Sequence, residues 1–317
     1  MRSYDLDRGL SATRIMYGCM PLGGSWDGQP PTAAARARAV KAVRAALDAG
    51  IDCFDHADIY CRGASEAVFA DALAEIGAGR DRLVLQSKCG IRFAGEPDAS
   101  APARYDFSYA HIVAATEGIL ARLRTDRLDL LVLHRPDALV EPEEVARAFD
   151  HLHAAGKVRH VGVSNHTAAQ IELMRRHVRQ RIVVNQVQLS LVHSHLIDDG
   201  VFANTDTATH GVAGTLDYCR LHGITIQAWG PLGGGAALGG AQRPELAKRI
   251  AAIRARAGCA AEAVPIAWLL RHPARIQPII GSTDPARIAA ACAADAIELS
   301  REEWYALATA ARGRPGP

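Results

Sequence analysis

The sequence predicts a single closed barrel in which eight parallel strands alternate with eight helices. Short apolar runs of β-prone residues recur along the chain, and a longer segment with helical periodicity follows each of them. No G-x-G-x-x-G turn follows the first run, as it would in an open dinucleotide-binding sheet. The 317 residues suit one domain, because single α/β barrels often exceed about 250 residues. We therefore expect a (β/α)8 domain over 1–312 and a Gly- and Pro-rich tail over 313–317 that frays.

The predicted elements alternate regularly in chain order. Strands are expected at 13–18, 51–56, 82–88, 128–133, 158–164, 182–187, 224–229 and 276–281, and helices at 32–49, 65–76, 108–124, 143–156, 167–178, 212–222, 243–257 and 284–294. Further helical segments are expected at 261–271 and 300–312. Start and stop signals agree, because the glutamates after Pro142 suit the first turn of a helix and Gly156 suits its end.

Two connections, 89–107 and 188–211, are longer than the usual link between elements. Both follow a strand, so in a parallel barrel both lie on the face formed by the carboxyl ends of the strands. Barrel enzymes build their active sites on that face. The sequence therefore predicts a TIM barrel with long loops on its C-terminal face.

Composition narrows the classes of function. Hydrophobic residues make up 49% and charged residues 22% of the chain, and the net charge is only +2 without a basic cluster. This argues against nucleic acid or a membrane surface as partner and favours a small molecule. The absence of a signal-peptide core and of long apolar runs predicts a cytoplasmic protein, and no surplus apolar helix stripe is evident, so we expect a monomer. Seven cysteines without C-x-x-C spacing predict reduced thiols.

The ends of the predicted strands carry many polar side chains, which a barrel would gather around one opening. The strand-end residues are Gly18, Asp55, Lys88, His134, Ser164, Asn165, Gln186, Trp229, Gly281 and Ser282. Each alone has an ordinary interpretation as a hydrogen-bonded strand end. Their convergence on one opening predicts a functional site.

Asp55, Tyr60, Lys88 and His134 together suggest a chemistry. When a hydride adds to a carbonyl carbon, negative charge develops on the oxygen and must be protonated or stabilised. Free tyrosine has a pKa of about 10, and a nearby lysine ammonium lowers it. Tyr60 is therefore the expected general acid, with Lys88 beside it, Asp55 fixing the lysine, and His134 orienting the carbonyl oxygen and sharing proton delivery.

Seven blocks spread over nearly the whole chain carry a resemblance to a known family. They are G-I-D-C-F-D-H-A-D-I-Y at 50–60, S-K-C-G at 87–90, L-D-L-L-V-L-H-R-P-D at 128–137, G-K-V-R-H-V-G-V-S-N at 156–165, N-Q-V-Q-L-S at 185–190, A-W-G-P-L-G-G-G at 228–235 and P-I-I-G-S-T at 278–283. The blocks resemble the aldo/keto reductases, in particular a YdhF-like bacterial branch. The resemblance implies an (α/β)8 barrel, NADPH as cofactor, and a catalytic tetrad of Asp55, Tyr60, Lys88 and His134.

The resemblance also implies how the barrel holds NADPH or NADP+. Ser164, Asn165 and Gln186 would hold the nicotinamide carboxamide, and Trp229 would offer a ring face where many relatives have tyrosine. The full set of expected contacts is Gly18, Met20, Ser164, Asn165, Gln186, Trp229, Gly230, Leu232, Gly233, Gly281, Ser282, Thr283 and Arg287. The glycines let backbone amides approach the pyrophosphate. Arg287, the hydroxyls and a helix N-terminus suit the 2′-phosphate, which favours NADPH over NADH.

Several positions leave questions open. Ala290 and Ala291 stand where many relatives have Glu-Asn against the adenine. Cys61 stands where relatives often have glycine, which leaves open both the backbone conformation beside Tyr60 and a redox role. Trp26 is expected to line the substrate pocket, with a core or surface role as the alternative.

We therefore expect an NADPH-dependent reductase of an aldehyde or ketone, an oxidoreductase acting on CH-OH groups with NADP and without a metal. Two alternatives stay open. A nicotinamide-nucleotide-binding redox sensor that docks on another protein would carry the same residues. A metal-dependent barrel hydrolase would use ligands from the segment Asp55-His56-Ala57-Asp58, to which His193 and His195 add an H-x-H pair in a loop of the catalytic face. The identity of the substrate is not encoded in any motif of the sequence.

Overall fold

Eight parallel strands close into a barrel in the computed structural model of the chain, which describes residues 1–203 and 214–316. The strands follow one another around the barrel in chain order, and the last pairs with the first. They are β3 (Met16–Gly18), β4 (Cys53–Asp55), β5 (Val84–Cys89), β8 (Leu128–Leu133), β9 (Val158–Ser164), β10 (Ile182–Gln188), β11 (Thr225–Trp229) and β12 (Gln277–Ile280). The predicted (β/α)8 barrel is confirmed.

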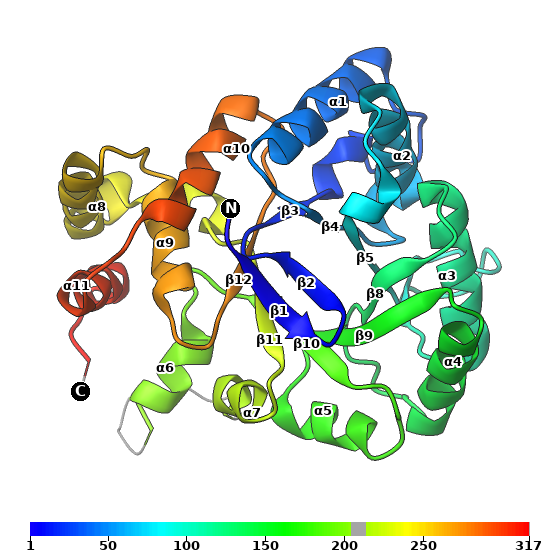
Figure 1. Cartoon of the computed structure of the whole chain (residues 1–317). Helices are drawn as coiled ribbons and strands as arrows, with labels where there is room; N and C mark the ends of the chain where they lie inside the picture. The colour runs from blue at the N-terminus through cyan, green and yellow to red at the C-terminus, as the bar shows by residue number, and fades with distance from the viewer. Residues whose placement is uncertain (204–213, 317) are drawn as a thin grey trace.

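Helices surround the barrel (Figure 1). They are α1 (Ala33–Asp48), α2 (Ala64–Ile76), α3 (Tyr109–Leu123), α4 (Pro142–Ala154), α5 (Ala168–Arg175), α6 (His195–Val201), α7 (Thr215–Leu221), α8 (Pro244–Ala257), α9 (Ala263–Arg271), α10 (Pro285–Cys292) and α11 (Arg301–Arg312). Short 3₁₀ turns occur at Met20–Gly23, Tyr60–Gly63, Arg80–Arg82, Gly233–Leu238, Gly240–Gln242 and Ala293–Ala296. None of the helices in the described ranges is long and apolar enough to cross a membrane.

The helix that covers the barrel after β11 is α9, whereas the sequence predicts this role for 243–257. α9 packs against β12, while α8 packs against α11 at the periphery (Figure 1). All residues from Ala263 to Leu270 are buried. Trp268 stacks on Trp304 of α11 with ring centroids 4.8 Å apart. A helix that is apolar on all sides is buried on all sides, which places α9 in the inner layer.

The N-terminal segment forms an antiparallel hairpin that the sequence pattern did not reveal. Its strands are β1 (Ser3–Asp7) and β2 (Leu10–Thr13). The predicted first barrel strand is therefore too long, because Thr13 belongs to β2 and β3 begins only at Met16. Leu6, Leu10, Ala12 and Thr13 of the hairpin are buried, whereas Ser3, Asp5 and Ser11 are exposed, as in a ribbon with one packed face.

The two long connections also contain short elements. The 89–107 connection holds a two-stranded ribbon, β6 (Ile91–Arg92) and β7 (Arg104–Tyr105), and the 188–211 connection holds α6. Residues 204–211 of the second connection, residues 212–213 of the predicted helix 212–222 and residue 317 of the predicted tail lie outside the described residues.

The β1–β2 hairpin closes one end of the barrel. In Figure 1 it lies across the centre of the barrel. Leu6, Leu10 and Ala12 are buried and join a core cluster of barrel-strand residues. The strand members of this cluster are Met16, Cys53, Leu130, Val132, Val183, Val184 and Ile279. Full burial of a leucine contributes about 1.5–3 kcal/mol. The hairpin therefore seals the barrel floor and leaves the opposite end open.

Gly162→Ala is expected to destabilise the protein by about 1–3 kcal/mol through overpacking of this cluster. A Cβ at Gly162 would lie 2.4 Å from Val184 Cγ2, inside the barrel where neither strand can shift freely. Urea denaturation followed by circular dichroism measures the change. Gly79→Ala is the matched control, because nothing lies within 4 Å of its added Cβ. Equal stability of the two variants would contradict the packing described.

Candidate active site

A cavity of about 800 Å³ opens at the carboxyl ends of the barrel strands. Its lining includes most of the residues predicted from the sequence: Gly18, Met20, Trp26, Asp55, Tyr60, His134, Ser164, Asn165, Gln186, Trp229, Gly230, Leu232, Gly233, Gly281, Ser282 and Arg287. Lys88 is fully buried behind Asp55. Thr283 is not among the lining residues. The strand ends thus converge on one opening, as the barrel topology requires.

The cavity also contains residues that the sequence did not point to. Arg135 follows His134 directly after β8, so the strand-end pattern extends to it. Glu262 immediately precedes α9, and nothing in its sequence context marks it as a cavity residue. Ile59 and Ile91 add apolar surface to the wall.

The centre of the site is a buried ion pair. Lys88 Nζ donates to both carboxylate oxygens of Asp55 at 2.7 Å and to the carbonyl oxygen of His56 at 2.8 Å. Burial by itself lowers the pKa of Lys88, but the Asp55 carboxylate and the Tyr60 phenol outweigh it, and the pKa is raised above its ordinary value. The lysine therefore stays a cation beneath the cavity.

A chain of glutamine amides inside the barrel supports the Asp55 carboxylate. Gln86 and Gln186 donate from Nε2 to Asp55 Oδ1 at 2.6 Å and 2.9 Å. Gln227 Oε1 accepts from Gln86 at 2.9 Å and from Gln186 at 3.3 Å. Gln227 donates to Gln277 Oε1 at 3.0 Å, and Gln277 donates to a backbone carbonyl at 2.7 Å. The buried carboxylate is thus held by hydrogen bonds from amides on neighbouring strands.

Tyr60 places its phenol next to this ion pair. Lys88 Nζ lies 4.9 Å from the centre of the Tyr60 ring. Burial raises the pKa of Tyr60 more than the Lys88 ammonium lowers it, so the net direction is upward. The sequence predicts only that Lys88 lowers the pKa of Tyr60, because a motif does not show how deeply the phenol is buried. The phenol is therefore protonated at neutral pH and is ready to give a proton.

His134 faces Tyr60 edge to face, with ring centroids 5.9 Å apart. Burial, followed by the charges of Lys88 and Arg135, lowers the pKa of His134 well below that of free histidine. Its Nδ1 is buried and has no hydrogen-bond partner in the described part of the chain. A neutral imidazole donates one hydrogen bond. His134 therefore suits the orientation of a carbonyl oxygen better than the delivery of a proton.

The backbone beside Tyr60 is left-handed, which answers the question raised by Cys61. Cys61 and Arg62 have φ values of 48° and 53°, a region that costs a non-glycine residue about 1–2 kcal/mol. Cys61 Sγ lies 3.4 Å from the carbonyl oxygen of Met20. A Cβ at Gly23 would lie only 2.6 Å from Cys61 Cβ. Close packing therefore holds this strained turn in place beside the phenol.

The thiols near the site are buried. All seven cysteines are free, and all except Cys259 are buried. Burial raises the pKa of Cys19 and Cys89 well above that of a free thiol. Because the thiolate is the reactive form, these surroundings do not favour redox chemistry.

One wall of the cavity presents an aromatic ring beside a polar network. Trp229 Nε1 donates to Asn165 Oδ1 at 3.2 Å. Asn165 Nδ2 donates to Ser164 Oγ at 2.8 Å, and Ser164 Oγ donates to the carbonyl oxygen of Gln186 at 2.7 Å. The network fixes the indole of Trp229 and aligns polar atoms along one side of it.

The far end of the cavity is less positive than the sequence predicts. Arg287 Nε lies 3.8 Å from Glu262 Oε1, and the Arg287 side chain is 54% exposed. α10 begins at Pro285, which has no backbone N–H, and Asp284 Oδ1 accepts from the amide of Ala286 at 2.8 Å. The N-terminus of α10 is thus partly occupied by its own cap.

The comparison with known families is decisive for the class of protein. The model of the aldo/keto reductase family matches residues 14–312, nearly the whole chain. The chain belongs to this family. The aldo/keto reductase resemblance seen in the seven sequence blocks is therefore confirmed.

Curated relatives and solved structures agree with this assignment. This aldo/keto reductase is 36% identical over 315 residues to 6-dehydroglucose reductase from Agrobacterium fabrum, with 99% of each chain covered. It is 37% identical over 272 residues to oxidoreductase YdhF from Escherichia coli, with 86% of each chain covered. An aldo-keto reductase from Klebsiella pneumoniae, solved in complex with NADPH, has a TM-score of 0.71 and 28% identity, over 98% of this chain and 94% of that one.

The question of the adenine contacts receives a partial answer from the geometry. Ala291 lines the cavity of this aldo/keto reductase, whereas Ala290 does not. Glu262 lines the cavity as well and pairs with Arg287 there. A carboxylate is therefore present at this end, supplied by the residue before α9 instead of by α10.

His56 and Asp58, named in the metal-dependent alternative, lie behind the tetrad. His56 is fully buried against Phe69, with ring centroids 4.5 Å apart, and burial lowers its pKa to about 3. Burial and then the nearby Glu66 raise the pKa of Asp58 to about 8, and its Oδ1 lacks a partner in residues 1–203 and 214–316. Within those ranges no group of three His, Cys, Asp or Glu side chains could hold a metal ion. The metal-dependent alternative gains no support.

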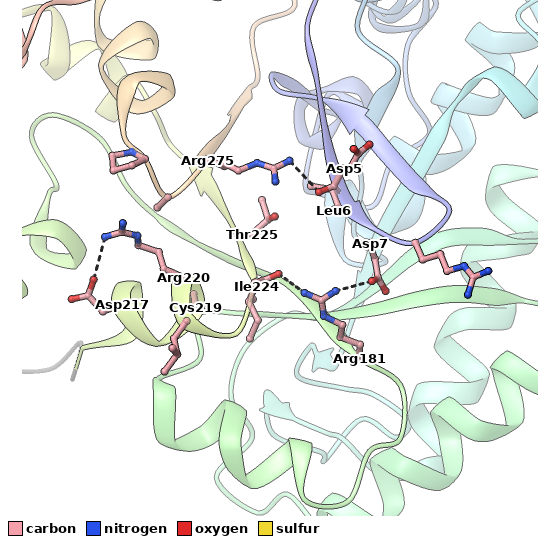
Figure 2. A pocket seen from close by; sticks show the side chains of 15 residues that line it. Asp5, Leu6, Asp7, Arg181, Asp217, Cys219, Arg220, Ile224, Thr225 and Arg275 are labelled. Atoms are coloured by element: carbon pink, nitrogen blue, oxygen red, sulfur yellow. Dashed lines mark hydrogen bonds and ion pairs between the residues drawn. The ribbon is translucent and has the colours of Figure 1, made fainter.

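A second cavity of about 730 Å³ lies at the hairpin end of the barrel, beside the first residue of β11 (Figure 2). Figure 2 shows Arg181, Arg220 and Arg275 turned toward carboxylate and carbonyl oxygens. Arg181 donates to Asp7 Oδ1 and to the carbonyl oxygen of Gly223, each at 2.8 Å. Arg275 donates to the carbonyl oxygen of Asp5 at 3.1 Å. These arginines tie the hairpin to the barrel, and none of the tetrad residues lines this cavity.

Asp58→Asn is expected to flatten the pH dependence of stability. The Asp58 carboxyl has a pKa of about 8 in the folded protein and 3.8 in the unfolded chain. Between these two pH values the folded protein therefore binds a proton that the unfolded chain does not. Its stabilising contribution is therefore complete below the unfolded pKa and is lost as pH rises through about 8. Between pH 6 and 9 the free energy of unfolding should fall by about 2.7 kcal/mol more in the wild type than in the variant.

Urea denaturation at a series of pH values measures this difference. Asp126→Asn is the control, because the Asp126 side chain is 80% exposed. Parallel pH profiles of wild type and Asp58→Asn would show that the buried carboxyl does not titrate as described.

Proposed function

We propose that this aldo/keto reductase uses NADPH to reduce an aldehyde or a ketone to the alcohol, with Tyr60 as the general acid. The observation that carries the proposal is a protonated phenol that faces the cavity with a charged lysine behind it. Hydride addition creates negative charge on the carbonyl oxygen, and a neutral phenol backed by an ammonium can neutralise that charge.

The cavity residues fit a nicotinamide nucleotide. Trp229 offers a ring face, and Ser164 and Gln186 offer polar atoms beside it for the carboxamide. The turn from Gly230 to Gly235 has positive φ values at its glycines, which brings backbone amides to the surface for a pyrophosphate. Bound NADPH would supply the hydride. The NADPH complex of the Klebsiella pneumoniae relative supports this choice of nucleotide.

Arg287 is the cation that we assign to the 2′-phosphate. It lines the cavity together with Ser282, and a guanidinium is well matched to a phosphate group. Glu262 at 3.8 Å and the Asp284 cap reduce the positive charge available there. Preference for NADPH over NADH therefore depends on Arg287.

Each tetrad residue then has one task. Tyr60 gives its proton to the substrate oxygen, Lys88 stabilises the phenolate that remains, and Asp55 holds the ammonium in place. The neutral His134 donates a hydrogen bond that aligns the carbonyl. Trp26, whose ring centroid lies 6.4 Å from that of Tyr60, provides a substrate-facing wall.

Tyr60→Phe is expected to bind NADPH with a dissociation constant within about twofold of the wild type and to lose at least about 100-fold in kcat. Quenching of tryptophan fluorescence by NADPH and by NADH measures binding, and NADPH consumption with a reactive aldehyde measures turnover. Tyr105→Phe is the matched control, because Tyr105 is exposed on the β6–β7 ribbon.

A different experimental result would contradict each part of the proposal. Undiminished turnover by Tyr60→Phe would remove Tyr60 as the acid. Absence of quenching by either nucleotide in the wild type would remove the cofactor assignment. Tight nucleotide binding without reduction of any carbonyl by the wild type would favour the redox-sensor alternative.

A further inference from the structure

A buried carboxylate outside the catalytic cavity has no part in the proposed mechanism. The Glu66 side chain has no exposed surface and does not line the cavity. Its Oε1 accepts a hydrogen bond from Ser87 Oγ at 2.6 Å, and its Oε2 accepts one from Arg122 Nε at 2.7 Å. Burial raises the pKa of Glu66, and the Arg122 cation is foremost among the groups that oppose this rise. We call these three side chains the Arg122–Glu66–Ser87 network.

The network joins three elements of the barrel wall. Glu66 lies in the first turn of α2, which begins directly after the 3₁₀ turn that starts at Tyr60. Ser87 precedes Lys88 on β5, and Arg122 lies in the last turn of α3, which packs against α2. The network therefore connects the chain just after Tyr60 to the chain just before Lys88, and it anchors both to α3.

Arg122 also lies against two glycines. A Cβ at Gly63 would be 2.8 Å from Arg122 Cδ, and a Cβ at Gly118 would be 3.0 Å from a terminal guanidinium nitrogen. Gly63, whose φ is 84°, is the third consecutive residue with positive φ in the turn that starts at Tyr60. The left-handed region costs about 1–2 kcal/mol for each non-glycine residue. The Arg122 side chain thus packs on a strained turn at the point where the turn joins α2.

We propose that Arg122 and Glu66 are positioning residues that hold the phenol of Tyr60 in place for proton transfer. A strained turn keeps one conformation only when the surrounding structure imposes it. The rigid guanidinium of Arg122 imposes it from the side of α2 and α3, because it contacts the turn and the Glu66 carboxylate together. A displacement of about 1 Å in a reacting group can lower the rate by about 100-fold. This inference rests on the proposed reductase function, in which Tyr60 is the acid.

Two variants of the buried pair separate positioning from stability. Arg122→Met leaves the Glu66 carboxyl without its cation, so it should lower both the stability in urea and kcat. The double variant Glu66→Gln/Arg122→Met contains no unpaired charge, so most of the lost stability should return. Its kcat with NADPH and a reactive aldehyde should nevertheless stay about 10–100-fold below that of the wild type, with KM changed by less than about threefold.

Hydrogen exchange followed by mass spectrometry tests the network without turnover. The amides of Arg62 and Ala64 donate to backbone carbonyl oxygens of this segment. They should exchange at least about fivefold faster in the double variant than in the wild type, because the turn opens more often without the network. Arg176→Met is the matched control, since the Arg176 side chain forms its ion pair on the surface and is 74% exposed. It should change neither the exchange nor kcat.

Recovery of kcat together with stability in the double variant would overturn the inference, because the pair would then serve stability alone. NADPH binding, measured by fluorescence, should stay within about twofold in every variant, and weaker binding that accounts for the lost turnover would also overturn it. A wild-type protein that reduces no carbonyl overturns the proposed function. In that case faster exchange of the Tyr60 turn in the double variant would still support the network, whereas unchanged exchange would overturn the network as well.

Discussion

The buried ion pair between Lys88 and Asp55 sets the conditions for the structure around it. Removing an ammonium and a carboxylate from water costs several kcal/mol per ion, and hydrogen bonds inside the protein must offset that cost. The barrel interior supplies them through amides from neighbouring strands, with Asp55 in register with Gln86 and Gln186 in register with Gln227. A slip of one residue between these strands would turn the amides away from the carboxylate. The hydrogen bonds that stabilise the buried ion pair therefore require this strand register.

Along its axis, the interior of the barrel contains three kinds of side chain. The end covered by the β1–β2 hairpin is apolar and contributes to stability. The middle zone consists of glutamine amides that pass hydrogen bonds from one strand to the next. The open end carries the titratable groups and the cavity. The apolar packing also reaches the open end, because Ile279 belongs to the cluster and lines the cavity, and Val132 pairs with Lys88.

Much of the fold and the location of the site could be predicted from the sequence because both follow from periodic patterns. Strand-end residues such as Asp55, His134 and Trp229 are placed by topology alone, so their convergence needs no side-chain detail. The direction of the Tyr60 pKa could not be predicted, because it depends on how completely the phenol is buried. Glu262 lies on no strand end and enters the cavity only because α9 is packed inward. The hairpin was missed because its strands, S-Y-D-L-D and L-S-A-T, contain Leu6 and Leu10 as their only large aliphatic residues and so form no apolar run.

The distribution of the thiols has a practical consequence for spectroscopy. Six of the seven cysteines are buried, and Cys259, in the turn between α8 and α9, is partly exposed. Three residues later the chain reaches Glu262, at the end of the cavity where Arg287 also lies. A maleimide dye would therefore attach to the native chain at a single dominant position. It would sit near the end of the cavity that we assign to the 2′-phosphate and could report on its occupancy without any engineered cysteine.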